Sequence, residues 1–235
     1  MIRKIGFSGK MTAGKTTISN QLEEKYDFVR LAIGDRIKKV ANLLIEDTNE
    51  LSKYLKGVLI PSNANKVLNF DEHVKYKTVL KHLIAMFDND FKNALFEKES
   101  NILYKKNADY RRLTQFVGDT VRQVCGEEIW CTILLNEADD LINRGMKIVC
   151  DDLRLEIEYT LFKERGYTLI RLDVEEDVQK QRIINLYGTL NEESLYHNTE
   201  IELDDKEFLH RIDTSSESIE ETFSRVEKIL YPTSN

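Results

Sequence analysis

Short runs of apolar residues alternate with longer stretches of helical periodicity at both ends of the chain. The runs have the length and content of buried strands, and they lie at 2–7, 28–32, 147–150, 168–174 and 208–212. Between and after these runs, recurring apolar positions predict helices over 17–26, 155–164, 178–186 and 219–230. Gly166 follows the second of these helices, where a left-handed cap residue is expected. Strands separated by helices predict a parallel, doubly wound α/β sheet.

The middle of the chain, from about 35 to 143, shows almost no strand pattern. Helical spacing is found over 37–45, at Val79, Leu83, Met86, Phe87 and Leu95, at Leu113, Phe116, Val117, Val121 and Val124, and over 129–142. Periodicity is weak over 46–76, and 61–65 has the composition of a surface loop. We therefore predict one domain whose core comprises about 1–34 and 144–235, with a helical lobe over about 35–143 inserted in it.

The overall composition limits the classes of partner. The chain has 235 residues, a net charge of −7 and 41% hydrophobic residues, which is ordinary for a globular protein. The acidic balance argues against a nucleic-acid polymer as a partner, although a local basic pocket for a small anion fits it. No apolar run approaches the length of a membrane span, and no signal segment follows Met1. Cys125, Cys131 and Cys150 lack metal-ligand spacing, so we expect reduced thiols in a cytoplasmic protein.

The segment Gly9-Lys10-Met11-Thr12-Ala13-Gly14-Lys15-Thr16 carries the most specific chemistry in the chain. It fits G-x-x-x-x-G-K-[ST], a phosphate-binding loop, between a predicted strand and a predicted helix. In that setting the loop N–H groups and the helix N-terminus bind a polyphosphate. Lys15 is placed to reach the β- and γ-phosphates, and the Thr16 hydroxyl to bind Mg2+. The predicted nucleotide-binding residues are Gly9, Lys10, Thr12, Ala13, Gly14, Lys15, Thr16 and Thr17.

Charged residues follow the strand predicted at 147–150. Asp151 and Asp152 close this strand, where a carboxylate can hold Mg2+ directly or through water. A solvated turn is the alternative, but the phosphate-binding loop favours the metal-binding role. Arg154 and Glu158 have the i, i+4 spacing of one helical face. The two side chains form a surface ion pair, or Glu158 holds Arg154 so that its guanidinium is directed at a phosphate.

Basic residues also gather on predicted helices of the middle region. One helix carries Arg111, Arg112, Gln115 and Arg122. Three arginines on one helix of an acidic chain suggest an anion site, although solvated arginines are common on helices. Asp35 either caps a helix that begins at Arg36 or faces the transferred phosphoryl group together with Lys38.

A polar loop that ends at Glu202 follows Lys180, Arg182 and Gly188. We interpret the region from about 182 to 202 as a mobile lid. Such a lid supplies cations to the γ-phosphate and excludes water during phosphoryl transfer.

Taken in order, these motifs resemble those of the bacteriophage deoxynucleoside monophosphate kinases, a branch of the P-loop nucleotide kinases. The resemblance is discontinuous but runs nearly end to end. It rests on the loop at 9–17, Leu31-Ala32 through Arg36-Ile37-Lys38, Arg111-Arg112-Leu113-x-Gln115-x-x-Gly118 leading to Trp130, Asp152-x-Arg154-x-x-x-Glu158 followed by Gly166, and His197-x-Thr199-Glu200. The loop is generic to many ATPases, whereas the ordered combination is much more specific.

The resemblance implies a three-layer P-loop kinase fold with a parallel sheet, a helical insertion that binds the nucleoside monophosphate, and a lid. It implies transfer of the γ-phosphoryl group of ATP, with Mg2+, to a dNMP, which gives dNDP and ADP. The expected catalytic residues are Lys15, Asp35, Arg154 and Arg182. The expected acceptor-binding residues are Lys38, Arg111, Arg112, Gln115, Arg122, Trp130 and Glu158, and the expected metal ligands are Thr16, Asp151 and Asp152. Positioning does most of the catalysis, because the acceptor is already a phosphate oxygen.

Two alternatives stay open at this point. Another small-molecule kinase, similar to dephospho-coenzyme A kinase, also suits an arginine-bearing helix that binds a phosphorylated acceptor. A nucleotide-dependent switch is the non-enzymatic alternative, but the chain has no N-K-x-D-like guanine element and no D-x-x-G at the strand end. The expected partners are small nucleotides, in the host cytoplasm if the protein is viral, with neither nucleic acid nor membrane. A homodimer is left open, and Trp130 on its apolar helix suits either a core or an interface.

Overall fold

The computed structural model describes residues 2–60, 70–100, 104–105, 107–188, 195 and 201–231. The loop predicted at 61–65, the element His197-x-Thr199-Glu200 and most of the polar part of the predicted lid lie outside the described residues. Contacts within the chain divide it into two units, which are Met1–Ala32 with Leu134–Asn235 (unit 1) and Ile33–Ile133 (unit 2).

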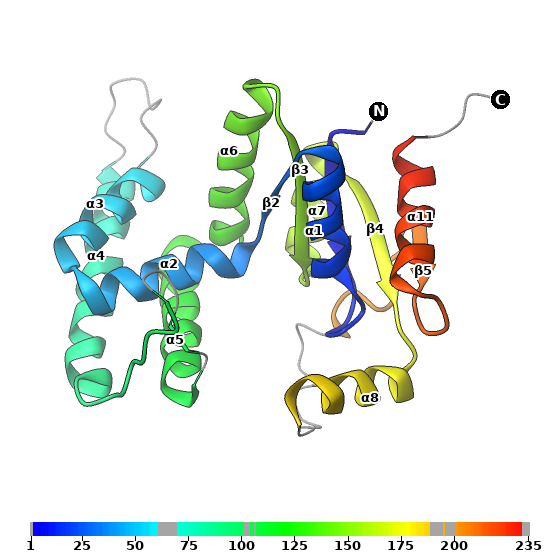
Figure 1. The fold of residues 1–235 in the computed structure, drawn as a ribbon. Helices are drawn as coiled ribbons and strands as arrows, with labels where there is room; N and C mark the ends of the chain where they lie inside the picture. Colours follow the sequence, from blue (N-terminus) through cyan, green and yellow to red (C-terminus); the bar gives the residue numbers. More distant parts are fainter. Residues whose placement is uncertain are drawn as a thin grey trace. The chain divides into compact units, whose positions relative to one another are not determined.

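Unit 1 is built on a sheet of five parallel strands in the order β2-β3-β1-β4-β5 (Figure 1). The strands are β1 Lys4–Ser8, β2 Phe28–Leu31, β3 Lys147–Leu153, β4 Thr168–Asp173 and β5 His210–Asp213. They lie where the apolar runs predict, which confirms the parallel α/β class. β3 continues past its predicted end because Leu153 is fully buried and pairs with Ser8. The strand order reverses at β1, and ligands in such sheets bind at the carboxyl ends of the strands beside that point.

Four helices of unit 1 follow its strands. They are α1 Lys15–Tyr26, α7 Glu156–Glu164, α8 Glu176–Tyr187 and α11 Ile219–Leu230. The last has its predicted bounds, and the Ser218 hydroxyl caps it by accepting a hydrogen bond from Glu221 N at 3.2 Å. α7 ends as predicted before Gly166, whose φ of 74° permits the capping hydrogen bond from Tyr167 N to Phe162 O at 3.1 Å.

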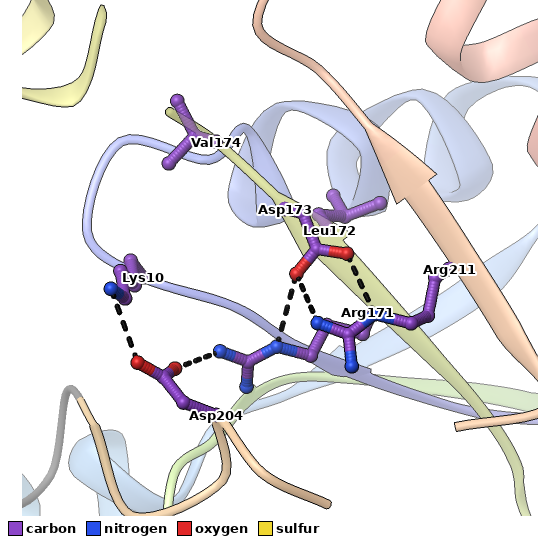
Figure 2. A pocket seen from close by; sticks show the side chains of 7 residues that line it. All are labelled: Lys10, Arg171, Leu172, Asp173, Val174, Asp204 and Arg211. Carbon is purple, nitrogen blue, oxygen red and sulfur yellow. Dashed lines mark hydrogen bonds and ion pairs between the residues drawn. The ribbon is translucent and has the colours of Figure 1, made fainter. Parts of the chain in front are cut away.

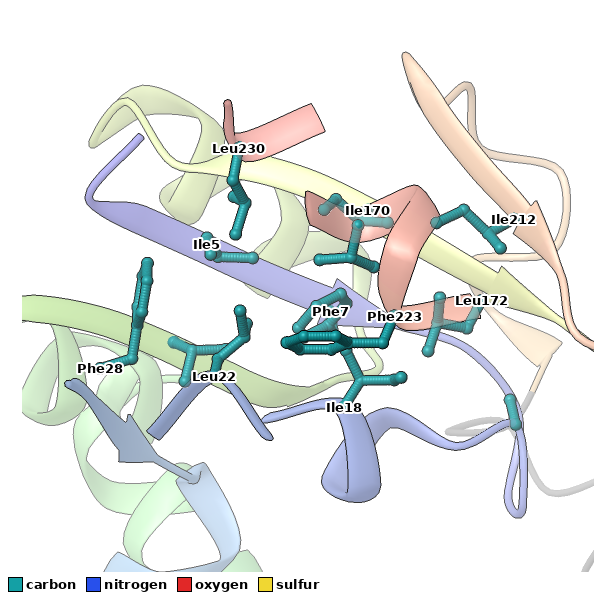
Figure 3. Packing of buried hydrophobic residues seen from close by; sticks show 13 residues of the cluster. Ile5, Phe7, Ile18, Leu22, Phe28, Ile170, Leu172, Ile212, Phe223 and Leu230 are labelled. Atoms are coloured by element: carbon teal, nitrogen blue, oxygen red, sulfur yellow. The ribbon is translucent and has the colours of Figure 1, made fainter. Parts of the chain in front are cut away.

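The core of unit 1 lies between the sheet and the helices α1 and α11 (Figure 3). Ile5 and Phe7 of β1 are fully buried, as their alternating positions in a strand predict. Ile18 and Leu22 of α1 are four residues apart and at most 1% exposed, and Phe223 of α11 packs in the same cluster. This packing fixes both β1 and α1, and therefore the ends of the loop that joins them.

Unit 2 is helical, as the lack of strand pattern predicts. It contains α2 Ile33–Glu46, α3 Thr48–Leu59, α4 Phe70–Met86, a π-helical turn η1 Phe87–Phe91, α5 Ala108–Cys125 and the beginning of α6 Ile129–Asn143. Val40, Leu83, Leu113 and Val117 are fully buried in its helices. Among the described residues of the whole chain, no helix is long and apolar enough to cross a membrane.

Three details of unit 2 differ from the sequence prediction. α2 begins at Ile33 rather than near 37, because Ile33 is buried and extends the apolar face of the helix. α3 was not predicted, because its buried residues repeat only once per turn, at Leu51, Leu55 and Leu59. Leu95, the last position of the predicted helical stripe, lies beyond the helix and is 73% exposed, since the helix ends in η1.

Candidate phosphate-binding site

The backbone of the loop between β1 and α1 requires two of its glycines. Gly9 has a φ of 145° and Gly14 a φ of 93°, a region that side chains rarely adopt. A Cβ at Gly9 would lie 2.3 Å from the carbonyl oxygen of Leu172 in β4, so the loop passes close to the neighbouring strand. α1 begins at Lys15, directly after Gly14. The loop therefore leads into a helix N-terminus, which is the arrangement that binds phosphate.

Replacement of Gly9 by alanine is expected to lower the free energy of unfolding by at least about 1–3 kcal/mol, because the new Cβ collides with backbone at a strained φ. Gly57 in α3 is the matched control, since a Cβ there meets nothing within 4 Å. Gly57→Ala should raise the free energy of unfolding by roughly 0.5–1 kcal/mol. Denaturant unfolding measures both changes, and a neutral Gly9→Ala would contradict the loop geometry.

Lys15 is buried within this loop. Its ammonium group donates to the carbonyl oxygens of Gly9 at 2.6 Å and of Lys10 at 2.8 Å, and the residue is 8% exposed. Burial, together with the nearby charge of Arg154, lowers the pKa of Lys15 to about 7, although the carboxylates at the end of β3 oppose this shift. A phosphate group in the loop supplies the negative charge that favours the protonated lysine.

The other predicted loop residues are held by the surrounding elements. Ala13 is fully buried, and its N–H donates to Lys10 O at 3.2 Å. Thr12 Oγ1 donates to Gln179 O at 3.5 Å, at the limit of a hydrogen bond. Thr17 is exposed in the first turn of α1. The loop is therefore anchored by its buried backbone, and its hydroxyl groups lie nearer the surface.

Asp151 joins three elements at the carboxyl end of β3. Its Oδ2 accepts hydrogen bonds from Thr16 Oγ1 at 2.7 Å and from Arg30 Nε at 2.8 Å, and its side chain is 1% exposed. Its Oδ1 is buried and has no hydrogen-bond partner among the described residues. A buried carboxylate oxygen without a donor is costly, so this atom is suited to a cation.

The hydrogen bond between Thr16 and Asp151 supports these two residues as Mg2+ ligands more strongly than their positions in the sequence do. Within the described part of the chain, no cluster of three or more His, Cys, Asp or Glu side chains could hold a metal by itself. Mg2+ in kinases keeps waters and substrate phosphates as ligands, so one hydroxyl and one carboxylate suffice. Asp152 is half-buried, and its Oδ1 accepts from Cys150 Sγ at 3.5 Å. Asp151, rather than Asp152, is the carboxylate bonded to Thr16.

Arg30 belongs to this group but was missed by the sequence analysis. It lies in β2 with Val149 of β3 as its register partner, and its guanidinium pairs with Asp151. The pairing places a permanent positive charge on the predicted metal ligand. The register in which Phe28 pairs with Lys147 cannot be inferred from the sequence, so no sequence signal places Arg30 near the end of β3.

Glu158 fixes the backbone that carries Arg154. Its Oε2 accepts hydrogen bonds from Arg154 N at 2.8 Å and from Leu155 N at 3.1 Å, which caps the start of α7. Glu158 is only 6% exposed, so its carboxylate lies below the surface. The charge of Arg154 acts on Lys15, which places this arginine near the phosphate-binding loop.

Arg182 connects the loop to the end of β5. From α8, its guanidinium donates to Thr12 O at 3.2 Å and to both Thr214 Oγ1 at 3.2 Å and Thr214 O at 2.6 Å. These bonds hold the loop backbone from a second side. The catalytic role of Arg182 in a lid stays a prediction.

The predicted acceptor-binding residues other than Glu158 lie in unit 2. Asp35 is in the first turn of α2 and pairs with Lys38 at 2.7 Å, so it does not cap a helix that begins at Arg36. On α5, Arg111 and Gln115 are exposed. Arg122 shares their helical face and has an Nε that is buried without a hydrogen-bond partner in the described structure, while its Nη1 lies 3.5 Å from Asp119.

Two residues of this predicted set make contacts within unit 2. Arg112 donates to Asp90 O at 3.1 Å, and its guanidinium lies 4.6 Å from the centre of the Phe91 ring. Trp130 is 1% exposed and donates from its indole N–H to Gly118 O at 3.1 Å. Burial leaves no indole surface for a substrate, so we reassign Trp130 to the core of its unit.

No protein-family model and no curated protein matches this chain. The solved structures that are similar to it include the dephospho-CoA kinase from Campylobacter jejuni, at 15% identity and a TM-score of 0.43 over 98% of this chain and 96% of that one. They also include TT1252 from Thermus thermophilus, at 15% identity and a TM-score of 0.46 over 98% of this chain and 97% of that one. Likeness at this level carries no argument about function, which rests on the geometry of the site.

Proposed function

We propose that this chain is an ATP-dependent kinase whose acceptor is a small molecule that already carries a phosphate group, namely a deoxynucleoside monophosphate. The observation that carries the proposal is the bond from the Thr16 hydroxyl to Asp151, next to Lys15 at the carboxyl edge of the sheet. A loop threonine bonded to a strand-end carboxylate is the arrangement with which P-loop enzymes hold Mg2+ on a nucleotide.

Each charged group has a proposed role in the transfer. Lys15 and the loop N–H groups hold the phosphates of ATP, and Thr16 with Asp151 holds Mg2+. The metal supplies neutralisation of the charge on the phosphoryl group that is transferred. Arg154 adds a planar cation to the same region, and buried Glu158 keeps its backbone in place.

The acceptor is proposed from the sequence resemblance and from the α5 face of unit 2. Arg111, Gln115 and Arg122 are spaced to lie on one side of that helix. The buried Nε of Arg122 has no hydrogen-bond partner in the described structure, which suits an anionic ligand. Any phosphorylated acceptor satisfies these residues, and the deoxynucleoside rests on the ordered motifs. Dephospho-CoA is the second candidate, because the sequence left that acceptor open.

A coupled assay of ADP release tests the proposal. Wild-type protein is supplied with ATP, Mg2+ and, in turn, each dNMP, the matching ribonucleotide and dephospho-CoA. We expect turnover that depends on at least one dNMP. Turnover with dephospho-CoA alone would replace the acceptor but keep the kinase. ATP hydrolysis that ignores every acceptor would contradict the kinase itself.

A further inference from the structure

A cluster of charges at the carboxyl end of β4 connects the phosphate-binding loop to the segment 201–208 (Figure 2). Asp204 of that segment pairs with Lys10 Nζ at 3.1 Å and accepts a hydrogen bond from Arg171 Nη2. Arg171 also donates to Ser8 Oγ at 3.1 Å and to Asp173 Oδ1 at 3.3 Å. One carboxylate therefore contacts the loop directly and, through Arg171, the last residue of β1.

The two links hold the loop at its beginning. Ser8 precedes Gly9 and is the register partner of Arg171 across the β1–β4 pairing. Lys10 follows Gly9, where an added Cβ would lie 2.3 Å from the Leu172 carbonyl oxygen of β4. Ser8 and Lys10 are thus tied to a common carboxylate on both sides of the glycine at which the chain turns.

The segment 201–208 is itself anchored on α7. Glu202 Oε1 accepts a hydrogen bond from Glu156 N at 2.7 Å, and Tyr159 Oη donates to Glu207 O at 2.7 Å. The ring of Phe208 packs edge-on against Tyr159, with centroids 5.1 Å apart. α7 begins directly after the residues around Arg154, so the segment that carries Asp204 contacts both the loop and the helix that follows Arg154.

The orientation of Asp204 is fixed because its partner Arg171 is buried. Arg171 is 3% exposed, and a buried guanidinium needs carboxylate partners to offset its lost hydration. Its bond holds Asp204 in one orientation. The Lys10 pair alone is partly exposed, at 29% and 31% of the two side chains, and such a pair contributes little by itself. Because Asp204 is already fixed, Lys10 loses less freedom in binding it.

We propose that Asp204 is a positioning residue for the phosphate-binding loop. It holds Lys10 directly and Ser8 through Arg171, so that the loop N–H groups are arranged before a nucleotide binds. The affinity of the loop for nucleotide then depends on a residue that does not touch the nucleotide. The inference rests on the proposed function only in requiring that the loop bind a nucleotide.

Calorimetric titration with MgADP tests this role without any phosphoryl transfer. Asp204→Asn removes the charge that holds Lys10 and Arg171, and we expect MgADP to bind about tenfold more weakly. Asp205→Asn is the matched control, because it removes the same charge from the next residue, which is exposed. The control should bind MgADP within about twofold of wild type. Wild-type affinity in Asp204→Asn, tighter binding, or an equal loss in Asp205→Asn would overturn the proposal.

A second variant guards against misfolding of Asp204→Asn, which weakens the pairing of a buried arginine. Lys10→Gln leaves the Arg171–Asp204 pair intact, so its thermal unfolding should match wild type while MgADP binds more weakly. In the double variant, the loss should not exceed that of Asp204→Asn alone, because Lys10 acts through Asp204. Fully additive losses would show that Lys10 contacts the nucleotide independently and would overturn the positioning role.

The two proposals fail in different ways. Normal MgADP binding by wild type without transfer to any acceptor would refute the proposed kinase and leave the role of Asp204 standing. An Asp204→Asn variant with wild-type affinity and normal transfer would refute the positioning role alone.

Discussion

Replacement of Asp151 by asparagine is expected to lower kcat for phosphoryl transfer by about 10²- to 10³-fold. The amide keeps the shape of the side chain and can still accept from Thr16, but it loses the charge that balances Arg30 and would hold Mg2+. The loss should therefore fall on catalysis and on the Mg2+ requirement more than on the fold. Initial rates measured across a Mg2+ titration report both effects.

Asp152→Asn is the comparison that makes this prediction specific. Asp152 carries the same charge one residue further along β3, but Thr16 is bonded to Asp151. We expect the smaller loss of kcat in Asp152→Asn. Equal losses, or a larger one in Asp152→Asn, would contradict the assignment of Asp151 as the metal ligand. Thermal unfolding of both variants separates a loss of chemistry from a loss of structure.

Replacement of Lys15 by methionine is expected to abolish transfer and, at pH 6, to raise the free energy of unfolding by about 1–3 kcal/mol. Folding lowers the pKa of Lys15 from 10.5 to about 7, so the folded state disfavours the charged lysine. Methionine fills a similar volume without a charge. The substitution lowers activity but raises stability, because a lysine that binds an anion is costly to bury when no anion is bound.

The lowered pKa of Lys15 also predicts how the stability difference between Lys15→Met and wild type changes with pH. Below pH 7 both the folded and the unfolded chain carry the Lys15 proton, so the wild type bears the full cost of burying the charge. Between pH 7 and 10.5 the unfolded chain binds more protons at this site than the folded one, and wild-type stability rises with pH. The advantage of Lys15→Met should therefore shrink from pH 7 upwards and be mostly gone by about pH 10.

Denaturant unfolding of wild type and Lys15→Met at pH 6, 8 and about 10 measures the difference between their free energies of unfolding. The contributions of the other titrating groups are the same in both proteins and cancel in this difference. A stability advantage of Lys15→Met that does not change with pH would show that burial does not shift the pKa of Lys15. An advantage that grows with pH would contradict the direction of the pKa shift.

The sheet of unit 1 was predictable from the sequence because its strands are short, apolar and separated by clear helical patterns. Ile5 and Phe7 alternate as a buried strand requires, and the glycines of the loop mark the turn that follows. α3 escaped prediction because a single leucine per turn gives a weak periodic signal. The early start of α2 escaped because Gly34 and Asp35 are typical of turns, and burial of Ile33 outweighs that preference.

The candidate site was predictable only where its residues are adjacent in the chain. The loop and the strand-end aspartates could be found from spacing. Arg30 and Asp204 could not be found in this way. Strand pairing in the sheet brings Arg30 to Asp151, and a segment distant in sequence brings Asp204 to Lys10. Trp130 was misassigned because an apolar helix gives no information about which of its faces is buried.

Transfer of a labelled γ-phosphoryl group tests the central claim most directly. Wild type and Lys15→Ala are incubated with γ-labelled ATP, Mg2+ and each dNMP, and the products are separated. The proposed function predicts label in the β-phosphate of dNDP for at least one dNMP with the wild type, and none with Lys15→Ala. Label that appears only in inorganic phosphate, or transfer that survives in Lys15→Ala, would contradict a phosphate-binding loop that serves a nucleotide kinase.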